Sequence, residues 1–228
     1  METLSDSTVE TDLSQKTLRE LNSELHNPTA SSYKVLNPRG GHSVAVGVKD
    51  PIDVEIEGDV GYFCAGMHQR GNITINGMAG PGVAENMMSG VVHVKGHASQ
   101  SAAATSHGGL LIVDGNASTR CGISLKGGDI VVKGNMGSKA AFMAQAGRIV
   151  VCGDVGEDLG DSIFEARLYV RGSVASLGAD CIEKEMRDEH REELVQLLKD
   201  AGMEDEANDA AYVDSFTRYG SARTLYNF

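Results

Sequence analysis

The amino-acid sequence predicts an all-β protein: a right-handed parallel β-helix of about seven 19-residue coils, with α-helical caps at both ends. Two observations carry this prediction. A glycine recurs every nineteen residues without insertion or deletion, and aliphatic residues stand four and two residues before each glycine. A fixed period of this size is the signature of a solenoid, in which one unit stacks on the next. We call these residues the first-corner glycines: Gly58, Gly77, Gly96, Gly115, Gly134, Gly153 and Gly172.

Each coil is expected to open with a short β-strand that ends at its first-corner glycine. The two aliphatic positions lie two residues apart, which is the periodicity of a strand with one buried face. The glycine would then turn the chain sharply, with a positive φ. The aliphatic pairs are Val54 and Ile56, Ile73 and Ile75, Val92 and Val94, Leu111 and Val113, Ile130 and Val132, Ile149 and Val151, and Leu168 and Val170.

The rest of each coil predicts corners rather than a helix. Small residues recur three, seven and thirteen residues after the glycine, and a segment so rich in glycine disfavours a helix. Because neighbouring strands lie about 4.8 Å apart, seven coils would form a column about 29 Å tall. The outward position would place Lys95, Asp114 and Lys133 in a ladder of alternating charge, worth about 0–1 kcal/mol per pair.

Residues 1–42 are expected to form an N-terminal tail and helix. Residues 1–11 have the character of a tail. A helix is predicted from Asp12, where Leu18, Leu21 and Leu25 form one stripe and Pro28 ends the pattern. The β-helix domain is assigned to residues 43–182, and its first residues, 43–48, alternate in a way that favours a leading strand.

Residues 183–228 are predicted to form an acidic helix and an aromatic docking tail. A solenoid exposes core and unpaired strand edges at its ends, so capping is the expected role of the helix, with partner docking as the alternative. The pattern stops at Gly202. The helical stripe begins just before this segment and consists of Ile182, Met186, Leu194, Leu197 and Leu198.

The last seventeen residues combine aromatic side chains with arginine, which are residue types enriched at interface hot spots. This segment would lie either on its own solenoid or on another chain, and both alternatives remain open. His68, Arg70 and His107 lie near a later corner and are polar enough to serve an interface. The candidate interface or passage residues are therefore His68, Arg70, His107, Tyr212, Phe216, Arg218, Tyr219, Arg223, Tyr226 and Phe228.

Charge and composition exclude several classes of function. The net charge is −12, carried by residues 1–29 and 180–209, and no basic stripe favours nucleic acid or an anionic membrane. No apolar run approaches a membrane span and no secretory h-region is present, so a cytoplasmic protein is expected. Four scattered cysteines without a CxxC motif favour reduced thiols.

No group of residues has the pattern of a catalytic or metal site. His93 and His97 are separated by the turn at Gly96, and two histidines leave a metal short of ligands. The glycine-rich stretch 77–82 does not follow the spacing of a phosphate loop. Asp158 and Asp161 offer at most a weak cation site. We expect no catalytic residue, no metal ligand and no cofactor-binding residue in this chain.

The coils resemble the GXGXG-type β-helix at the C-terminus of the glutamate synthase large subunit, over about residues 40–182. The matching elements are corner motifs such as Gly58-x-x-Gly61 and Gly153-x-x-Gly156, although Ser99 and Ser118 stand where glycine is usual. The β-helical subunit of formylmethanofuran dehydrogenase is similar. A separate chain of this length ending in RYGSARTLYNF most resembles the small β-helix subunit of N-methylglutamate synthase.

This resemblance implies a non-catalytic subunit of a hetero-oligomeric enzyme. One partner would be a glutamine-amidotransferase-like subunit, and the other would carry FMN and iron–sulfur clusters. The complex would convert methylamine and L-glutamate to N-methylglutamate and ammonia. In the glutamate synthase relatives the β-helix carries no reacting group, braces the other domains and helps to wall an ammonia passage.

Other assignments fit parts of the sequence. The chain could belong to glutamate synthase itself or to a formyl-transferring dehydrogenase. It could also be a homo-oligomeric structural solenoid, which the low net charge of the coils permits. A β-helix enzyme acting alone, such as a polysaccharide lyase, is disfavoured because the unbroken nineteen-residue count leaves no room for long active-site loops.

Overall fold

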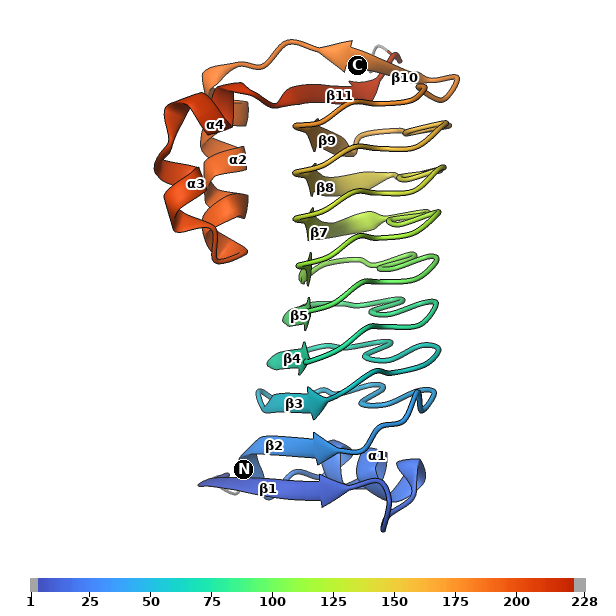
Figure 1. Cartoon of the computed structure of the whole chain (residues 1–228), viewed down its shortest axis with the longest axis vertical. Helices are drawn as coiled ribbons and strands as arrows, with labels where there is room; N and C mark the ends of the chain where they lie inside the picture. The colour runs from blue at the N-terminus through green and yellow to red at the C-terminus, as the bar shows by residue number, and fades with distance from the viewer. Residues whose placement is uncertain (1–3, 224–228) are drawn as a thin grey trace, which may run out of the picture.

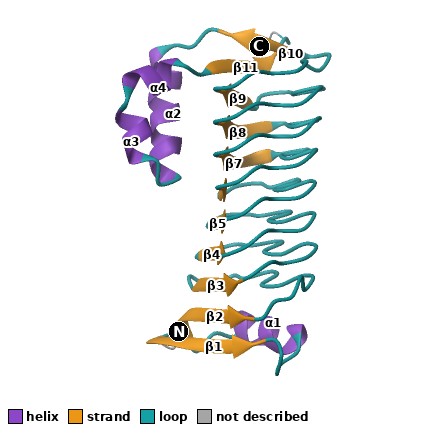
Figure 2. Ribbon diagram, in the orientation of Figure 1, coloured by secondary structure: helices purple, strands orange, loops and turns teal. Residues whose placement is uncertain are grey.

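The computed structural model describes residues 4–223 and shows a parallel β-solenoid with a short helix at one end and a helical segment along one side (Figure 1). The strands stack in chain order in one 11-stranded sheet, except that β11 enters between β9 and β10. Loops and turns make up most of every coil, as Figure 2 shows. This arrangement confirms the fold class predicted from the nineteen-residue period.

The strands and helices are as follows. The strands are β1 (Ser5–Asp12), β2 (Ala30–Leu36), β3 (Asp53–Glu57), β4 (Asn72–Ile75), β5 (Val91–Val94), β6 (Leu110–Val113), β7 (Lys126–Val132), β8 (Ala146–Val151), β9 (Arg167–Val170), β10 (Cys181–Lys184) and β11 (Thr217–Ser221). The helices are α1 (Leu18–His26), α2 (Asp188–Asp200), α3 (Glu204–Asn208) and α4 (Ala210–Asp214).

The strand register follows the predicted period from β3 to β9 and departs from it before β3. Val54 pairs with Ile73, nineteen positions later, and the same offset continues to β9. In the other direction Val54 pairs with Tyr33 and Tyr33 pairs with Val9, and both of these offsets are longer than the period. The expected tail at residues 1–11 is therefore largely a strand, and the sheet begins well before residue 43.

The predicted leading strand at residues 43–48 is wrong, because this stretch forms the corner that joins β2 to β3. Its inward side chains, Val44 and Val48, are nevertheless fully buried in the solenoid core. The sequence alternates here but the burial does not, because Ala45 is buried as well and Val46 is only half-buried. A corner can therefore imitate the sequence pattern of a strand. The actual leading strands lie at β1 and β2, outside the regular repeat.

Helix α1 covers the N-terminal end of the solenoid, as the cap prediction required. Leu21 and Leu25 are fully buried against the core, and the side chain of Asn22 donates to the carbonyl of Ser43 at 2.9 Å. The helix begins later than expected: Thr17, not Asp12, is the N-cap, and it forms a capping box with Glu20. A capping box satisfies two backbone N–H groups at once, so it fixes the start of the helix.

The first-corner glycines are required by close stacking rather than by a left-handed backbone. Only Gly58 has a positive φ, so the expectation of positive φ is wrong for the other six. A Cβ atom on Gly77 would lie 2.5 Å from the carbonyl carbon of Gly58 and 2.7 Å from the backbone nitrogen of Asp59. From the coil of Gly77 onward, each coil therefore rests on the backbone of the one before it at this corner.

Left-handed residues occur instead seven positions after the first-corner glycine. This position holds Ala65, Ala84, Ala103, Gly122, Ala141 and Gly160 in the first six coils, with φ between 52° and 69°. The residues two before and two after it are left-handed as well. Most of these residues are not glycine, so they carry a backbone strain that the stacked neighbours must hold in place.

The interior of the solenoid is filled by side chains from several faces of each coil. Besides the two aliphatic residues of every strand, Val60, Ala79 and Ala98 begin a second buried ladder of isolated parallel bridges. Between these faces, side chains at the first corner accept hydrogen bonds from the next coil. The side-chain oxygen of Asn116 accepts from the backbone nitrogen of Asn135 at 2.9 Å, and Asn135 repeats this contact with Asp154 at 2.9 Å.

The C-terminal end of the solenoid is closed by strands, and the predicted helix of this region lies elsewhere. β11 pairs antiparallel with β9 and with β10. Helix α2 does not lie across this end but beside the coils, as Figure 1 shows. Ile182, assigned to the helical stripe from sequence, stands on β10 and is 41% exposed. Within residues 4–223 the helices are too short or too polar to cross a lipid bilayer.

Candidate functional site

The outward face of the strands changes character halfway along the solenoid. The outward residue between the two aliphatic positions is polar in the first three coils and apolar or aromatic in the last four. The apolar members are nearly or fully buried, at 0–4% exposure, although they point away from the core. The polar members are Glu55, Thr74 and His93, and the apolar members are Ile112, Val131, Val150 and Tyr169.

The helical segment covers the apolar half of this face. Leu194, Leu197 and Leu198 on α2 are buried in one cluster with the outward residues of β6 to β9. The short helices α3 and α4 complete the cover, with Val213 and Phe216 in the same cluster. The three leucines therefore form a helical face as predicted, but they pack on the side of the solenoid.

Glu193 fastens helix α2 to the sheet. Its carboxylate is 15% exposed and accepts hydrogen bonds from Tyr169 Oη at 2.5 Å and Arg167 Nη2 at 2.8 Å. Arg148 Nη1 lies 3.5 Å away and completes the cluster, while Arg148 also binds Asp129 through two nitrogens. Burial and the nearby Glu193 raise the pKa of the Tyr169 hydroxyl, so this group stays protonated and donates.

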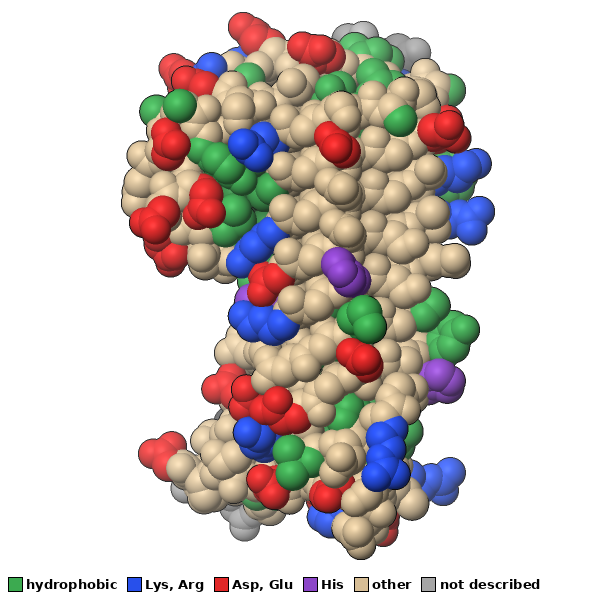
Figure 3. All heavy atoms as spheres, in the orientation of Figure 1, with side chains coloured by type: hydrophobic (Ala, Val, Ile, Leu, Met, Phe, Trp, Pro, Cys, Tyr) green, Lys and Arg blue, Asp and Glu red, His purple; other side chains and the backbone are tan. Residues whose placement is uncertain are grey.

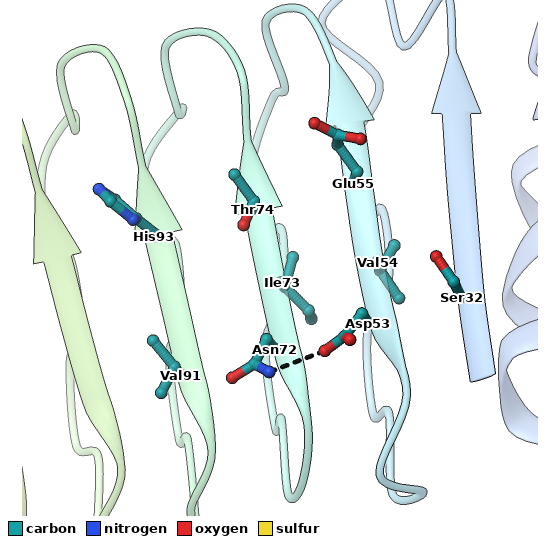
Figure 4. Close-up of a pocket in the computed structure, with 9 residues that line it drawn as sticks. All are labelled: Ser32, Asp53, Val54, Glu55, Asn72, Ile73, Thr74, Val91 and His93. Atoms are coloured by element: carbon teal, nitrogen blue, oxygen red, sulfur yellow. Dashed lines mark hydrogen bonds between the residues drawn. The ribbon is translucent and has the colours of Figure 1, made fainter. Parts of the chain in front are cut away.

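Below the helical segment the outward face of β2 to β5 is open and forms a groove of about 440 Å³. Its polar lining includes Asp53, Asn72, Thr74 and His93, which Figure 4 shows side by side on neighbouring strands. Asn72 donates to Asp53 at 2.7 Å, so part of the groove is already held in place. Figure 3 shows the molecule narrowing at this level, between the helical segment and the N-terminal strands.

A charged cluster around Asp114 marks the upper border of the groove. Asp114 lies 2.9 Å from His93 Nε2, 2.9 Å from Lys133 Nζ and 3.7 Å from Lys95 Nζ. The charge ladder predicted from sequence is therefore confirmed, with His93 as an added member. Burial alone would raise the pKa of Asp114, but the hydrogen bonds from Lys133 and His93 hold that pKa below its usual value.

A second ion pair stands at the lower border of the groove. Lys34 lies 3.0 Å from Glu57, and Asn76 donates to Glu55 at 2.9 Å. The hydrogen bond from Lys34, followed by that from Asn76, lowers the pKa of Glu57. The groove is thus a polar surface with fixed carboxylates, suited to hydrogen-bonded contact with another molecule.

The structure separates the three candidates from the first coils. His68 is fully buried in the core, where burial lowers the pKa of its imidazole although Gly71 accepts a hydrogen bond from Nε2 at 3.0 Å. The prediction of His68 as an interface residue is therefore wrong, because its side chain is inaccessible to a partner. Arg70 and His107 are exposed at corners away from the groove. His107 stands one position further along its coil than His68, which explains the different exposure.

The C-terminal candidates pack on their own chain as far as the structure describes them. Tyr212 contacts Phe216 edge to face at 5.6 Å and lies under the Arg171 guanidinium at 4.6 Å. Tyr219 packs partly against the solenoid core. These contacts favour the interpretation in which the segment lies on its own solenoid. Tyr226 and Phe228 are outside the described residues.

Arg218 and Arg223, also among the candidates, are brought together at the C-terminal end. Arg218 Nη1 donates to the carbonyl of Glu185 at 3.1 Å, and Arg223 Nη2 binds Asp180 at 2.8 Å. Both line one cavity beside β10 and β11. The sequence pointed to these arginines as interface residues but gave no sign that they share a cavity.

The four cysteines are free and buried, and this makes a testable prediction. Burial raises the pKa of Cys64 and Cys121 to about 12 and that of Cys181 to about 11, so almost no thiolate exists at neutral pH. Ellman's reagent should label no cysteine of the native protein within minutes and all four after denaturation. Rapid labelling of any one thiol in the native protein would contradict this packing.

Within residues 4–223 no three histidine, cysteine or acidic side chains are grouped closely enough to hold a metal ion. Besides the cavity shared by Arg218 and Arg223, sequence reasoning missed the groove and the Glu193 contact. The signal for both was present: the outward position switches from His93 to Ile112 at the fourth coil. An apolar outward residue on a strand needs another part of the protein to shield it from water. The switch therefore marks the border between the open face of β2 to β5 and the face of β6 to β9 that the helices cover.

Comparison with known proteins finds a relative at high identity and solved chains with a similar fold. The chain is 64% identical to "Protein GlxC" from Rhizobium meliloti (strain 1021) over 221 residues, which covers 95% of both chains. A chain in the crystal structure of the formyltransferase/hydrolase complex FhcABCD from Methylorubrum extorquens, in complex with methylofuran, has a similar fold. Its TM-score is 0.66 at 23% identity, over 91% of this chain and 90% of that one. No family model matches the sequence.

Proposed function

The chain belongs to the family of Protein GlxC, and we propose that it is a non-catalytic β-helix subunit of a multi-subunit, glutamate synthase-like flavoenzyme. The specific activity proposed is that of N-methylglutamate synthase, which joins methylamine to L-glutamate and releases ammonia. The resemblance of the corner motifs to the GXGXG β-helix supports the class of enzyme. The fold shared with a chain of the FhcABCD complex supports a role within an assembly.

The observation that carries this proposal is the half-covered sheet. The apolar outward residues of β6 to β9 are sealed by the chain's own helices, whereas the polar face of β2 to β5 remains open. A polar groove bordered by the Asp114 cluster and the Lys34–Glu57 pair suits a hydrogen-bonded subunit contact. We assign this groove to the docking of a partner subunit.

The role of the chain in the reaction would be positioning and confinement. Its interior is filled with aliphatic side chains, so an ammonia or amine passage would run between this chain and a partner rather than through the coils. A stiff column fixes the distance between two partner sites, and a closed wall keeps a small amine from escaping to solvent. The glutamine-amidotransferase-like and FMN/iron–sulfur subunits would supply the reacting groups.

Purification of the tagged full chain from the cells that produce it tests the proposal. We expect the chain alone to be colourless and inactive, and the chain with its partners to contain flavin and iron and to form N-methylglutamate from methylamine and L-glutamate. Turnover by the pure chain would contradict the proposal. A homo-oligomer without any flavoprotein, detected by mass measurement, would contradict it as well.

A groove variant tests the docking assignment. Thr74→Arg places a long side chain in the middle of the groove and should reduce the co-purified flavin about tenfold or more, because its bulk fills the space of the partner surface and its guanidinium pairs with Glu55 on the neighbouring strand. Gln69→Arg adds the same side chain at an exposed corner outside the groove and should leave the flavin content unchanged. Equal loss in both variants would mean that the groove is not the docking face.

Formyl transfer is the second candidate, because the similar solved chain belongs to a formyltransferase/hydrolase complex. The same purified assembly distinguishes the two. Formyl transfer without N-methylglutamate formation would favour this second candidate over the first.

A further inference from the structure

A second cavity, of about 490 Å³, lies at the C-terminal end of the solenoid where β11 enters between β9 and β10. Its walls come from the corners that precede β8 and β9 and from the paired strands β10 and β11. Four of its lining residues are cationic, and Glu165 is the only acidic residue of the lining. The cationic residues are Arg167, Lys184, Arg218 and Arg223.

This concentration of positive charge is unusual in a chain with a net charge of −12. Arg167 and Arg223 are partly neutralised, by Glu193 and Asp180, each at 2.8 Å. Lys184 and Arg218 form no ion pair with any residue in the described range 4–223. The cavity is therefore lined by two cations without an ion pair, Lys184 and Arg218. Its other two cations, Arg167 and Arg223, pair with carboxylates that are not part of the lining.

Two donor groups of the lining residues lack a partner. Arg167 Nε and Arg218 Nε are shielded from solvent and donate to no acceptor among residues 4–223. A shielded N–H group without an acceptor is unfavourable unless a ligand or an ordered water binds it. The pKa of the neighbouring His190 is lowered mainly by burial, and the positive charge of Arg218 lowers it further.

The shape of the cavity leaves room for more than a bare ion. Gly220 stands on β11 in its wall, and a Cβ atom there would find no neighbour closer than 3.6 Å. Phe164, which is 44% exposed, contributes an apolar wall. A volume of this size is typical of sites for small molecules. Cationic and apolar walls together suit a ligand with an anionic head and an apolar body.

We propose that this cavity binds a small organic anion, whose carboxylate or phosphate group is held by Lys184, Arg218 and Arg223. Arginine and lysine recognise both groups through charge-assisted hydrogen bonds. A small molecule is the proposed occupant because the two shielded N–H groups and the free space beside Gly220 lie on the lining of one cavity of about 490 Å³. The inference does not depend on the proposed function, because it concerns the isolated chain and the opposite end of the solenoid from the groove.

Calorimetric titration of the full chain tests the site with two probes, inorganic phosphate and L-glutamate, against sodium chloride at matched ionic strength. At least one probe should bind saturably with one site per chain. Binding of L-glutamate alone would identify a carboxylate ligand, and binding of phosphate alone would identify a phosphate ligand. Lys184→Met should weaken the binding about tenfold or more.

Two further variants locate the binding. Gly220→Val places a branched side chain against Lys184 without changing the charge of the cavity and should weaken the binding, with folding checked by circular dichroism. Lys49→Met removes an exposed lysine from the corner that precedes β3, far along the solenoid from the cavity, and should have no effect. The inference is overturned if neither probe binds saturably, if Gly220→Val binds as tightly as the natural protein, or if Lys49→Met weakens binding as much as Lys184→Met. Binding of an acidic peptide alone would overturn it in favour of a protein partner.

Discussion

Gly77→Ala is expected to lower the free energy of unfolding by about 3 kcal/mol or more. The added Cβ would lie 2.5–2.7 Å from three backbone atoms of Gly58 and Asp59. Backbone atoms cannot move away by changing a rotamer, as a flexible side chain can. The two coils must therefore separate, and the backbone hydrogen bonds between them must lengthen. Denaturant unfolding of the variant and the natural protein measures the loss.

Gly220→Ala is the matched control for this prediction. Gly220 also lies in the sheet and has no positive φ, but its Cβ would meet ordinary contacts at 3.6 Å or beyond. Its stability should change by less than about 1 kcal/mol. A similar small loss for Gly77→Ala would show that the coils do not stack on bare backbone at the first corner.

Glu193→Ala is expected to destabilise the attachment of helix α2 by about 2 kcal/mol, because it removes one partner of a largely buried ion-pair cluster. A fully buried pair would lose about 3–5 kcal/mol, and the partial exposure of Arg148 and Arg167 places this site below that range. The variant leaves two guanidinium groups and the Tyr169 hydroxyl without their shared acceptor. Hydrogen exchange should rise across α2 to α4, while the strands of the first coils remain protected.

The neighbouring glutamate provides the control. Glu192 is more exposed on the same helix, and Glu192→Ala makes the same chemical change with the same effect on helix propensity. Its exchange rates and melting temperature should match those of the natural protein. If the two variants behave alike, the cluster around Glu193 does not hold the helix to the sheet.

The fold was predictable because one glycine and two aliphatic positions repeat without interruption for seven coils. The first coils escaped prediction because α1 and a longer corner lengthen the offset between paired strands, and a period detects only equal spacing. Gly77 shows a subtler limit. A glycine can mean either a left-handed backbone or a close approach, and only the structure distinguishes them.

The candidate site was less predictable than the fold, because it depends on where the helical segment lies. The leucines of α2 indicated an apolar helical face, but they gave no information on whether it covers the end or the side of the column. The change from His93 to Ile112 on the outward face carried that information. The cationic cavity at Lys184 and Arg218 arises from antiparallel pairing of strands that are far apart in sequence, which no local pattern reveals.

The constant register from β3 to β9 makes the length of this molecule a discrete quantity. Duplication or loss of a whole nineteen-residue unit would change the separation of the two ends by about 4.8 Å. The strand pairing and the core contacts between the remaining coils would stay the same. In the proposed assembly, gain or loss of whole coils would therefore change the distance between two bound subunits in fixed steps. An insertion of any other length would break this register and need its own packing, as the segment with α1 between β1 and β2 finds by burying Leu21 and Leu25 against the end of the solenoid.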